Sequence, residues 1–179
     1  MSLRSISQTA SFAMLVATAA AAQQPSQPAK PAAPSSYAIP IGTSISLDVA
    51  RKAAAAASAE AKKNGWFMAI AVVDPAGTLV YFEKADTTQL GSSQVAIGKA
   101  RSAALYKRPT KVFQDSLEKG GANLRILALE GAVPVDGGAP LLVDGKLIGA
   151  LGVSGDLAEH DGQCAAAGAA VLVTATAAR

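Results

Sequence analysis

Residues 134–156, PVDGGAPLLVDGKLIGALGVSGD, decide the fold of this chain. Two apolar runs, 139–143 and 146–153, flank the dipeptide Asp144-Gly145, which is typical of a two-residue β-hairpin turn. Val153-Ser154-Gly155-Asp156 then leads into a helical stretch that carries the single His and the single Cys of the sequence. We therefore predict two antiparallel strands that deliver the chain to the start of a helix.

The sequence ahead of this stretch predicts a second hairpin between helices. An alanine-rich segment, 47–63, follows the capping residue Ser46 and ends at Asn64-Gly65, which indicates a helix. The β-prone runs 67–73 and 78–84 flank a turn with Pro at its second position and Gly at its fourth.

Further helices follow each hairpin. We expect helices over 91–106, ended by Pro109, over 110–117, capped by Thr110, and over 157–178, with an irregular connection over 120–131. The order α-β-β-α-(α)-β-β-α predicts an α+β fold, an α/β sandwich whose central antiparallel sheet is built from two hairpins with helices packed on it.

The N-terminus has the pattern of an export signal. One basic residue, Arg4, precedes an apolar run over 11–22 that ends in three alanines, so we predict a signal peptide over 1–22. This run is too short to span a bilayer, and we expect no membrane span in the mature chain. Residues 23–42 are rich in Pro, Ala and Gln and predict a disordered lead-in, and 43–179 form one domain. We expect a periplasmic or secreted protein.

Charge and cysteine content exclude several classes of function. Removal of Arg4 with the signal lowers the formal charge from +3 to +2, which is too small to indicate a nucleic-acid or membrane-surface partner. A single cysteine, Cys164, forms no intrachain disulfide, and we expect it to pack in the core. Gly149, Gly152 and Gly155 lack the spacing of a dinucleotide loop, and Gly149 and Gly152 favour close packing of a helix on a strand.

The residues quoted above, with others, resemble the GlcG/HbpS family, also described as a haem-binding or haem-degrading domain, and the C-terminal domain of PduO-type proteins. The resemblance extends over 46–175 and rests on residues 72–82, Ala96, Lys99-Ala100, Thr110, 137–141, 149–155, Asp161 and Gly168. It implies an α/β sandwich, a homo-oligomer, and haem as the ligand in some members. Lys84-Ala85-Asp86 and His160 depart from the residues that the family often has at these positions.

Several residues are candidates for binding an anionic ligand. Ser154, Gly155 and Asp156 stand where a strand ends and a helix begins, so free amides can face a carboxylate, or the side chains can simply cap the helix. Lys99, on an alanine-rich helix, either holds such an anion or is a solvated lysine. Asp161 either orients its neighbour His160 or receives a lysine. Gly138, at the start of the last hairpin, completes the expected ligand-binding set.

His160 is the candidate metal ligand. A neutral imidazole can bind haem iron axially, whereas an ordinary surface or capping role is the alternative. With one His in the sequence, no familiar hydrolase site is present, so the catalytic residues remain unassigned. We expect a protein that binds haem, or a similar anionic small molecule, between the last hairpin, the last helix and the Lys99 helix, with haem degradation and redox sensing as candidate roles. The alternatives are an enzyme acting on a small organic acid, with Lys99 and Asp161 transferring protons, and an oligomeric accessory or sensor protein without catalysis.

Overall fold

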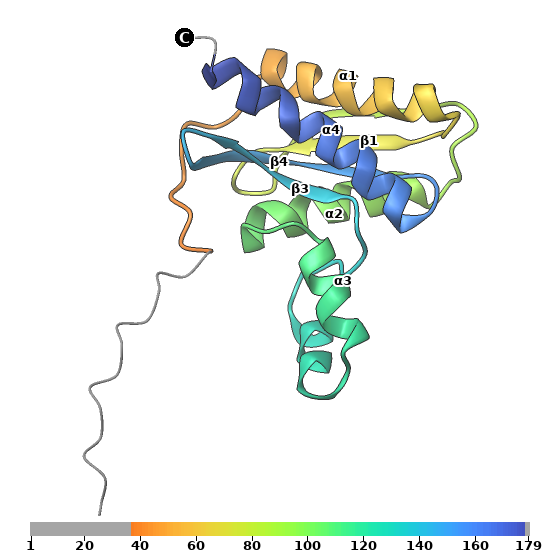
Figure 1. The fold of residues 1–179 in the computed structure, drawn as a ribbon, viewed down its shortest axis with the longest axis vertical. Coiled ribbons are helices and arrows are strands. Elements are labelled where there is room, and N and C mark those ends of the chain that lie inside the picture. The colour runs from red at the N-terminus through yellow and green to blue at the C-terminus, as the bar shows by residue number, and fades with distance from the viewer. Residues whose placement is uncertain (1–36, 178–179) are drawn as a thin grey trace, which may run out of the picture. The chain divides into compact units, whose positions relative to one another are not determined.

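The computed structural model describes residues 37–177, with side chains to residue 172. The predicted signal peptide, residues 23–36 of the lead-in and the predicted last helical residue, 178, lie outside the described residues. In chain order the elements are α1 (Leu47–Asn64), β1 (Ala69–Val73), β2 (Leu79–Lys84), α2 (Ser92–Tyr106), α3 (Lys111–Glu118), the 3₁₀ helix η1 (Gly121–Ala128), β3 (Gly138–Val143), β4 (Lys146–Ser154) and α4 (Ala158–Ala177) (Figure 1). The predicted α+β fold and its element order are confirmed.

The four strands form one antiparallel sheet in the order β2-β1-β4-β3. Each predicted hairpin is present, and the two join where β1 pairs with β4, from Ala69 opposite Ser154 to Val73 opposite Ala150. The side chain of Asp74 accepts hydrogen bonds from two amides of the first turn. Asp144 and Gly145 both have positive φ, 50° and 71°, as a tight hairpin turn requires. The turn residues therefore set the register of both hairpins.

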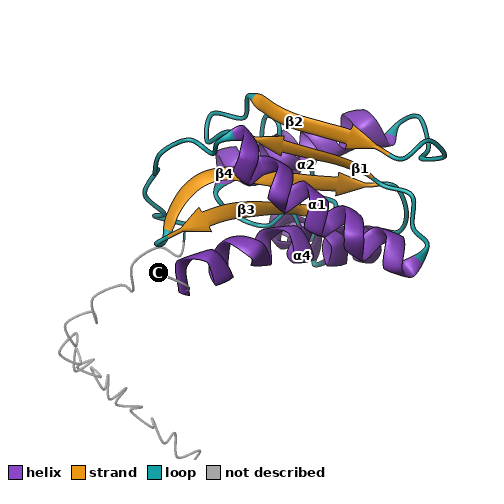
Figure 2. Cartoon of the chain, turned by 90° about the horizontal axis from the view of Figure 1, so that it is seen from above, coloured by secondary structure: helices purple, strands orange, loops and turns teal. Residues whose placement is uncertain are grey.

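Helices cover both faces of the sheet (Figure 2). α1 and α4 lie side by side on one face, where the buried alanines of α1 meet Ile70 and Val72 of β1. α2 covers the other face, where its own alanines meet Ala69, Ala71 and Val73. Successive side chains of β1 thus point to opposite faces of the sheet and pack in different helix layers, as the pleat of a strand requires. Because β1 is buried on both faces, its sequence shows no polar alternation.

Gly152 allows α2 to approach the sheet closely. A Cβ atom at this position would lie 2.4 Å from the Ala100 nitrogen and would also overlap the carbonyl oxygen of Ala96. The predicted close packing of a helix on this strand is confirmed. Alanine on the helix and glycine on the strand together bring two backbones into contact.

The end of the lead-in is ordered, although the sequence predicts disorder as far as residue 42. Leu147 donates its amide to the Pro40 carbonyl, and Gly42 donates to the Leu147 carbonyl, both at 2.8 Å. Residues 40–42 thereby add a short parallel pairing beside β4, beyond the end of β1. An unpaired strand edge leaves backbone groups unsatisfied, and this pairing satisfies them.

The segment between α2 and β3 differs in detail from the prediction. α3 begins at Lys111, and the hydroxyl of Thr110 does not cap it but accepts the amide of Gly138 at 2.8 Å. η1 lies within the stretch predicted to be irregular. Among the described helices, none is long and apolar enough to cross a membrane.

Candidate functional site

Lys99 and Asp161 form an ion pair inside the protein. The Lys99 Nζ atom lies 2.7 Å from Asp161 Oδ2, and the two side chains are 1% and 3% exposed. The sequence left Lys99 as either an anion-binding or a solvated residue, and the structure gives it a carboxylate of its own chain. Of the two roles expected for Asp161, receiving a lysine is the one that the structure shows.

Asp161 also occupies the start of α4. Its Oδ1 atom accepts the amide of Asp156 at 3.3 Å, and the amide of Gly155 is a further donor. Burial raises the pKa of Asp161, and the hydrogen bond from Lys99 opposes that rise. The amides that the sequence offered to an external anion therefore face a carboxylate within the chain, which is favourable at the positive end of a helix dipole.

Gly137 and Gly138 bring β3 against this pair. Gly137 has a φ of 119°, and a Cβ atom there would lie 2.9 Å from Lys99 Nζ. A Cβ atom at Gly138 would lie 2.6 Å from the carbonyl oxygen of Lys99. Asp136, just before them, is half-buried, and burial raises the pKa of its carboxyl although the Gly137 amide donates to it. The structure thus groups Gly138, Lys99 and Asp161 in a closed, polar part of the interior.

His160 lies apart from this pair, on the first turn of α4. Its ring stacks on the indole of Trp66, with ring centroids 3.9 Å apart and planes 11° from parallel. Its buried Nδ1 atom lies 3.6 Å from Asp156 Oδ1, beyond hydrogen-bonding distance. Ser154 is buried and Asp156 is exposed. The predicted site residues therefore divide between the Lys99 interior and the surface around His160.

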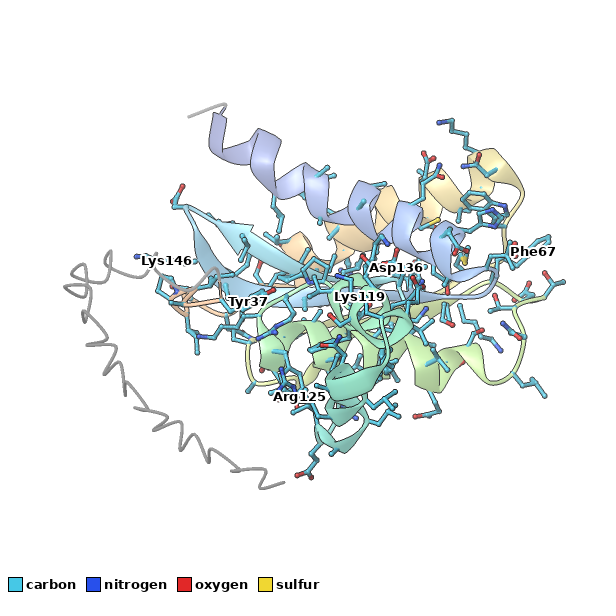
Figure 3. The ribbon with its side chains drawn as sticks, turned by 60° about the horizontal axis from the view of Figure 1, so that its bottom comes forward. Tyr37, Phe67, Lys119, Arg125, Asp136 and Lys146 are labelled. Atoms are coloured by element: carbon cyan, nitrogen blue, oxygen red, sulfur yellow. The ribbon has the colours of Figure 1, made fainter. Side chains whose placement is uncertain are left out.

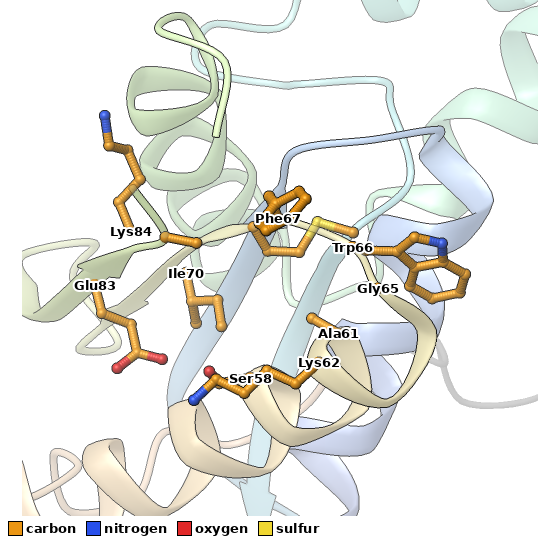
Figure 4. Close-up of a pocket in the computed structure, with 11 residues that line it drawn as sticks. Ser58, Ala61, Lys62, Gly65, Trp66, Phe67, Ile70, Glu83 and Lys84 are labelled. Atoms are coloured by element: carbon orange, nitrogen blue, oxygen red, sulfur yellow. The ribbon is translucent and has the colours of Figure 1, made fainter. Parts of the chain in front are cut away.

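A cleft of about 400 Å³ opens next to Trp66 (Figure 4). It lies between the C-terminal end of α1, the start of β1 and the end of β2. Its apolar lining includes Trp66, Phe67, Met68 and Ile70, of which Phe67 is 55% exposed and Met68 and Ile70 are buried. The volume is within the range of small-molecule sites, and large apolar side chains around a concave space are typical of them.

Charged side chains line the rim of the cleft. Lys62 comes from the last turn of α1, and Lys84 and Glu83 come from the end of β2. The carboxylate of Glu83 accepts the hydroxyl of Tyr81 at 2.8 Å, and this hydrogen bond raises the pKa of Tyr81. Glu83 pairs with Ile70 on the α1 face of the sheet, whereas Lys84 pairs with Ala69 and its ammonium group points toward α2 (Figure 4), so the rim presents the Lys62 ammonium and the Glu83 carboxylate to a ligand inside.

The cleft was not predicted from the sequence. The available signal was the run Trp66-Phe67-Met68, which places three large apolar side chains directly after a helix stop in a chain with only 4% aromatic residues. The β-prone pattern predicts that Phe67 and Met68 belong to a strand, but β1 begins at Ala69. Side chains at a junction between a helix and a strand follow neither the helical nor the strand repeat of buried positions. They can therefore line a cavity.

Two further observations bear on metal chemistry. Cys164 is buried as predicted, and burial raises the pKa of its thiol to about 12, so the free thiol stays protonated at neutral pH. In the part of the chain that the structure describes, no three His, Cys, Asp or Glu side chains gather as a metal site.

Comparison with known proteins gives sequence relatives over most of the domain. The model of the family described as "Haem degrading protein HbpS-like" matches residues 45–170. Protein GlcG of Escherichia coli K12 is 38% identical over 110 residues, which cover 62% of this chain and 81% of GlcG. A 15.0 kDa protein of Citrobacter freundii, encoded between dhaT and dhaS, is 30% identical over 120 residues and is covered to 84%.

Solved structures show the same fold. The Klebsiella pneumoniae protein ORFY aligns with a TM-score of 0.69 at 25% identity, over 74% of this chain and 92% of ORFY. HbpS aligns with a TM-score of 0.67 at 32% identity, over 73% of this chain and 92% of HbpS. A complex of PduOC with haem aligns with a TM-score of 0.65 at 29% identity, over 72% and 94%. The family match and these likenesses agree with the sheet order and helix layers described above, and this chain belongs to the HbpS-like family.

Proposed function

We propose that this protein binds haem, and that the cleft beside Trp66 holds it. The observation that carries the proposal is the lining of the cleft, which combines aromatic and aliphatic side chains inside with the Lys62 ammonium group at the rim. One solved relative, PduOC, is described as a complex with haem. Haem combines a flat apolar ring with two carboxylates, which is the combination that this lining complements.

The residues of the cleft fit such a group. Phe67 offers a ring surface to a planar ligand, Met68 and Ile70 supply an apolar floor, and Trp66 borders the cleft with its indole directed toward His160 (Figure 4). Lys62 stands at the water-exposed rim, where a carboxylate keeps its hydration while it gains a charged partner. When bound, haem supplies iron that can take an axial ligand and change oxidation state.

His160 is the candidate axial ligand to the iron. It lies against Trp66, a wall of the cleft, and its side chain is 31% exposed. It is not itself among the lining residues. Movement of the imidazole away from Trp66 would give its nitrogen atoms access to a ligand in the cleft. The iron ligand is therefore a separate question from binding, and it needs its own measurement.

Titration with haemin tests the proposal. We expect the mature protein to give a sharpened, shifted Soret band that saturates at one haemin per chain. In the variant His160→Ala, haemin should still bind, but the position of the Soret band should change because the iron loses its ligand. If the spectrum of haemin stays that of the free compound, haem is not the ligand.

We further propose that the protein is exported and forms a homo-oligomer. The support for export is the N-terminal sequence alone, with a predicted cleavage after residue 22. The support for assembly is the family resemblance. Sequencing of the N-terminus of the protein recovered from outside the cytoplasm tests the first, and light scattering of the purified protein tests the second. An intact N-terminus or a monomeric mass would overturn the respective proposal.

A further inference from the structure

We infer that two copies of this chain assemble through the outer edge of β2, with the β2 strands of the two copies side by side and antiparallel. The inference rests on the proposed homo-oligomer, because it names the surface by which the copies meet. It also gives a role to Arg51 and Glu83, two charged residues beside this edge.

The outer edge of β2 is open. β2 comes first in the sheet order β2-β1-β4-β3, and within the described residues no strand or bridge pairs with its outer side (Figure 2). The amide of Ala85, directly after β2, donates to the carbonyl of Met68 on the inner side. Backbone groups of successive residues in a strand alternate between its two sides, so those of Phe82 and Lys84 point outward. These groups can therefore pair with a further strand.

The sequence of β2 favours such a pairing. The strand reads LVYFEK, without Pro or Gly, and all of its side chains are at least partly exposed. The first of them, Leu79, is 42% exposed. The strand at the other edge of the sheet, β3, contains Pro140, which has no amide to donate. Proteins protect an exposed edge with proline, charge or a covering segment, and within the described residues the apolar start of β2 has none of these.

Two charges without an ion-pair partner lie beside this edge, on the α1 face of the sheet. Arg51 shares one side of α1 with Ser58 and Lys62, which line the cleft next to β2. Arg51 therefore also faces β2, about 10 Å before Ser58 along the helix. Its charge lowers the pKa of Tyr81, against the rise that the hydrogen bond to Glu83 causes. Among the described residues, neither Arg51 nor Glu83 forms an ion pair.

A two-fold axis between antiparallel β2 strands makes these charges complementary. When Phe82 lies opposite Phe82 of the second copy, Glu83 lies opposite Tyr81 of the second copy. Arg51 of the second copy stands next to that tyrosine, so it faces the Glu83 carboxylate. A two-fold interface repeats every contact, so the same pair forms again on the other side of the axis. The edge is thus complementary to itself, which favours a second copy of this chain over an unrelated strand.

Charge variants, studied by light scattering and sedimentation, test the inference. Arg51→Glu and Glu83→Lys each place like charges opposite one another across the axis. Each should raise the Kd for dissociation of the assembly about tenfold or more, because every interface contains the contact twice. The double variant Arg51→Glu, Glu83→Lys restores opposite charges across the axis and should recover most of the assembly.

Two further variants complete the test. Lys52→Glu is the matched control, because Lys52 is exposed and lies a further 100° or so around α1, away from β2. It should assemble as the wild type does. Lys84→Pro removes an outward amide and no hydrogen bond of the chain's own sheet, so it should fold and shift the protein toward monomers. Circular dichroism checks the fold of every variant.

The outcomes separate the inference from the assembly on which it rests. If the wild type is monomeric, the proposed homo-oligomer is wrong and the inference falls with it. If the wild type is an oligomer whose mass and Kd none of the variants changes, the copies meet elsewhere, and the inference is overturned while the proposed assembly stands. If the single charge variants dissociate and the double variant does not recover, Arg51 and Glu83 do not face one another, which overturns the antiparallel pairing.

Discussion

The indole of Trp66 and the imidazole of His160 lie face to face, 3.9 Å apart, and connect the end of α1 to the first turn of α4. Trp66 is the single tryptophan of the sequence and also lines the cleft. One chromophore therefore senses both the proposed ligand and the proposed iron ligand. No other tryptophan contributes to the signal.

The first prediction uses this chromophore. Haemin in the cleft should quench most of the Trp66 emission with the same saturation point as the Soret titration, because the acceptor ring lies next to the indole. The emission spectrum of ligand-free His160→Ala should also shift, since the indole loses its stacking partner. Quenching that rises without saturation would indicate contact in solution and would contradict a site at Trp66.

The second prediction concerns space in the cleft. Ser58 lines the cleft and is partly exposed, so the substitution Ser58→Phe should fill part of the volume and weaken haemin about tenfold or more while the fold persists. Ala59→Phe is the matched control, because Ala59 is exposed and is not a lining residue. Equal haemin affinity in the two variants would place the ligand elsewhere. Circular dichroism checks that both variants fold.

The third prediction concerns the Lys99–Asp161 pair. Lys99→Met leaves the Asp161 carboxylate buried without its partner and should lower the free energy of unfolding by about 3–5 kcal/mol. The double variant Lys99→Met, Asp161→Leu should recover part of this loss because no buried charge remains. Urea unfolding measures both.

The exposed pair Lys111–Asp115 supplies the control for this prediction. Its side chains are 55% and 44% exposed and the pair is screened by water, so Lys111→Met should cost far less stability than Lys99→Met. A Lys99→Met variant as stable as Lys111→Met would show that the interior pair contributes little.

The fourth prediction concerns the contact between α2 and the sheet. Gly152→Ala places a methyl group against backbone atoms of α2, which cannot rotate away, so the helix must shift. We expect a loss of about 3 kcal/mol or more, or failure to fold. Gly91→Ala has open space around the new methyl group and a φ of −67°, and it should be close to neutral. Thermal unfolding of the two variants, side by side, is the measurement.

The fifth prediction concerns alkaline pH. Burial raises the pKa of Cys164 from 9.0 to about 12. Above the lower value the unfolded chain releases the thiol proton and the folded chain keeps it, so this residue's contribution to stability is present below pH 9 and is lost as the pH rises toward 12. Between about pH 8 and about pH 10 the wild type should lose about 1 kcal/mol more than Cys164→Ala. Parallel losses in the two proteins would rule this effect out.

Local patterns predicted most of the fold. The residue types of Asp144-Gly145 and of the Asp74 turn are enough to predict their conformations. Ser46 and Gly65 mark the ends of α1 as expected. Thr110 shows the limit of such patterns. A hydroxyl before a helix predicts a cap, but the amide of Gly138, 28 residues away in sequence, is its partner.

The site was harder to predict, because its contacts join distant parts of the chain. Lys99 and Asp161 are 62 residues apart, and the sequence around either residue does not predict a contact with the other. The cleft forms where the end of α1 packs beside the start of β1 and the end of β2. This packing is not visible in local sequence patterns. Sequence patterns identified His160 as a candidate ligand, but its neighbour Trp66 becomes visible only when α1 and α4 lie side by side.

The pairing of residues 40–42 with Leu147 determines which end of the domain faces a partner or surface that is attached through the N-terminus. Leu147 lies near the N-terminal end of β4, next to the hairpin turn. The cleft lies near the other end of this strand, where β4 ends at Ser154. Phe67 and Lys146 mark these two ends (Figure 3). A surface or fusion partner attached ahead of Pro40 joins the domain at the end remote from the cleft. Immobilisation through the N-terminus should therefore leave the mouth of the cleft turned toward the solution.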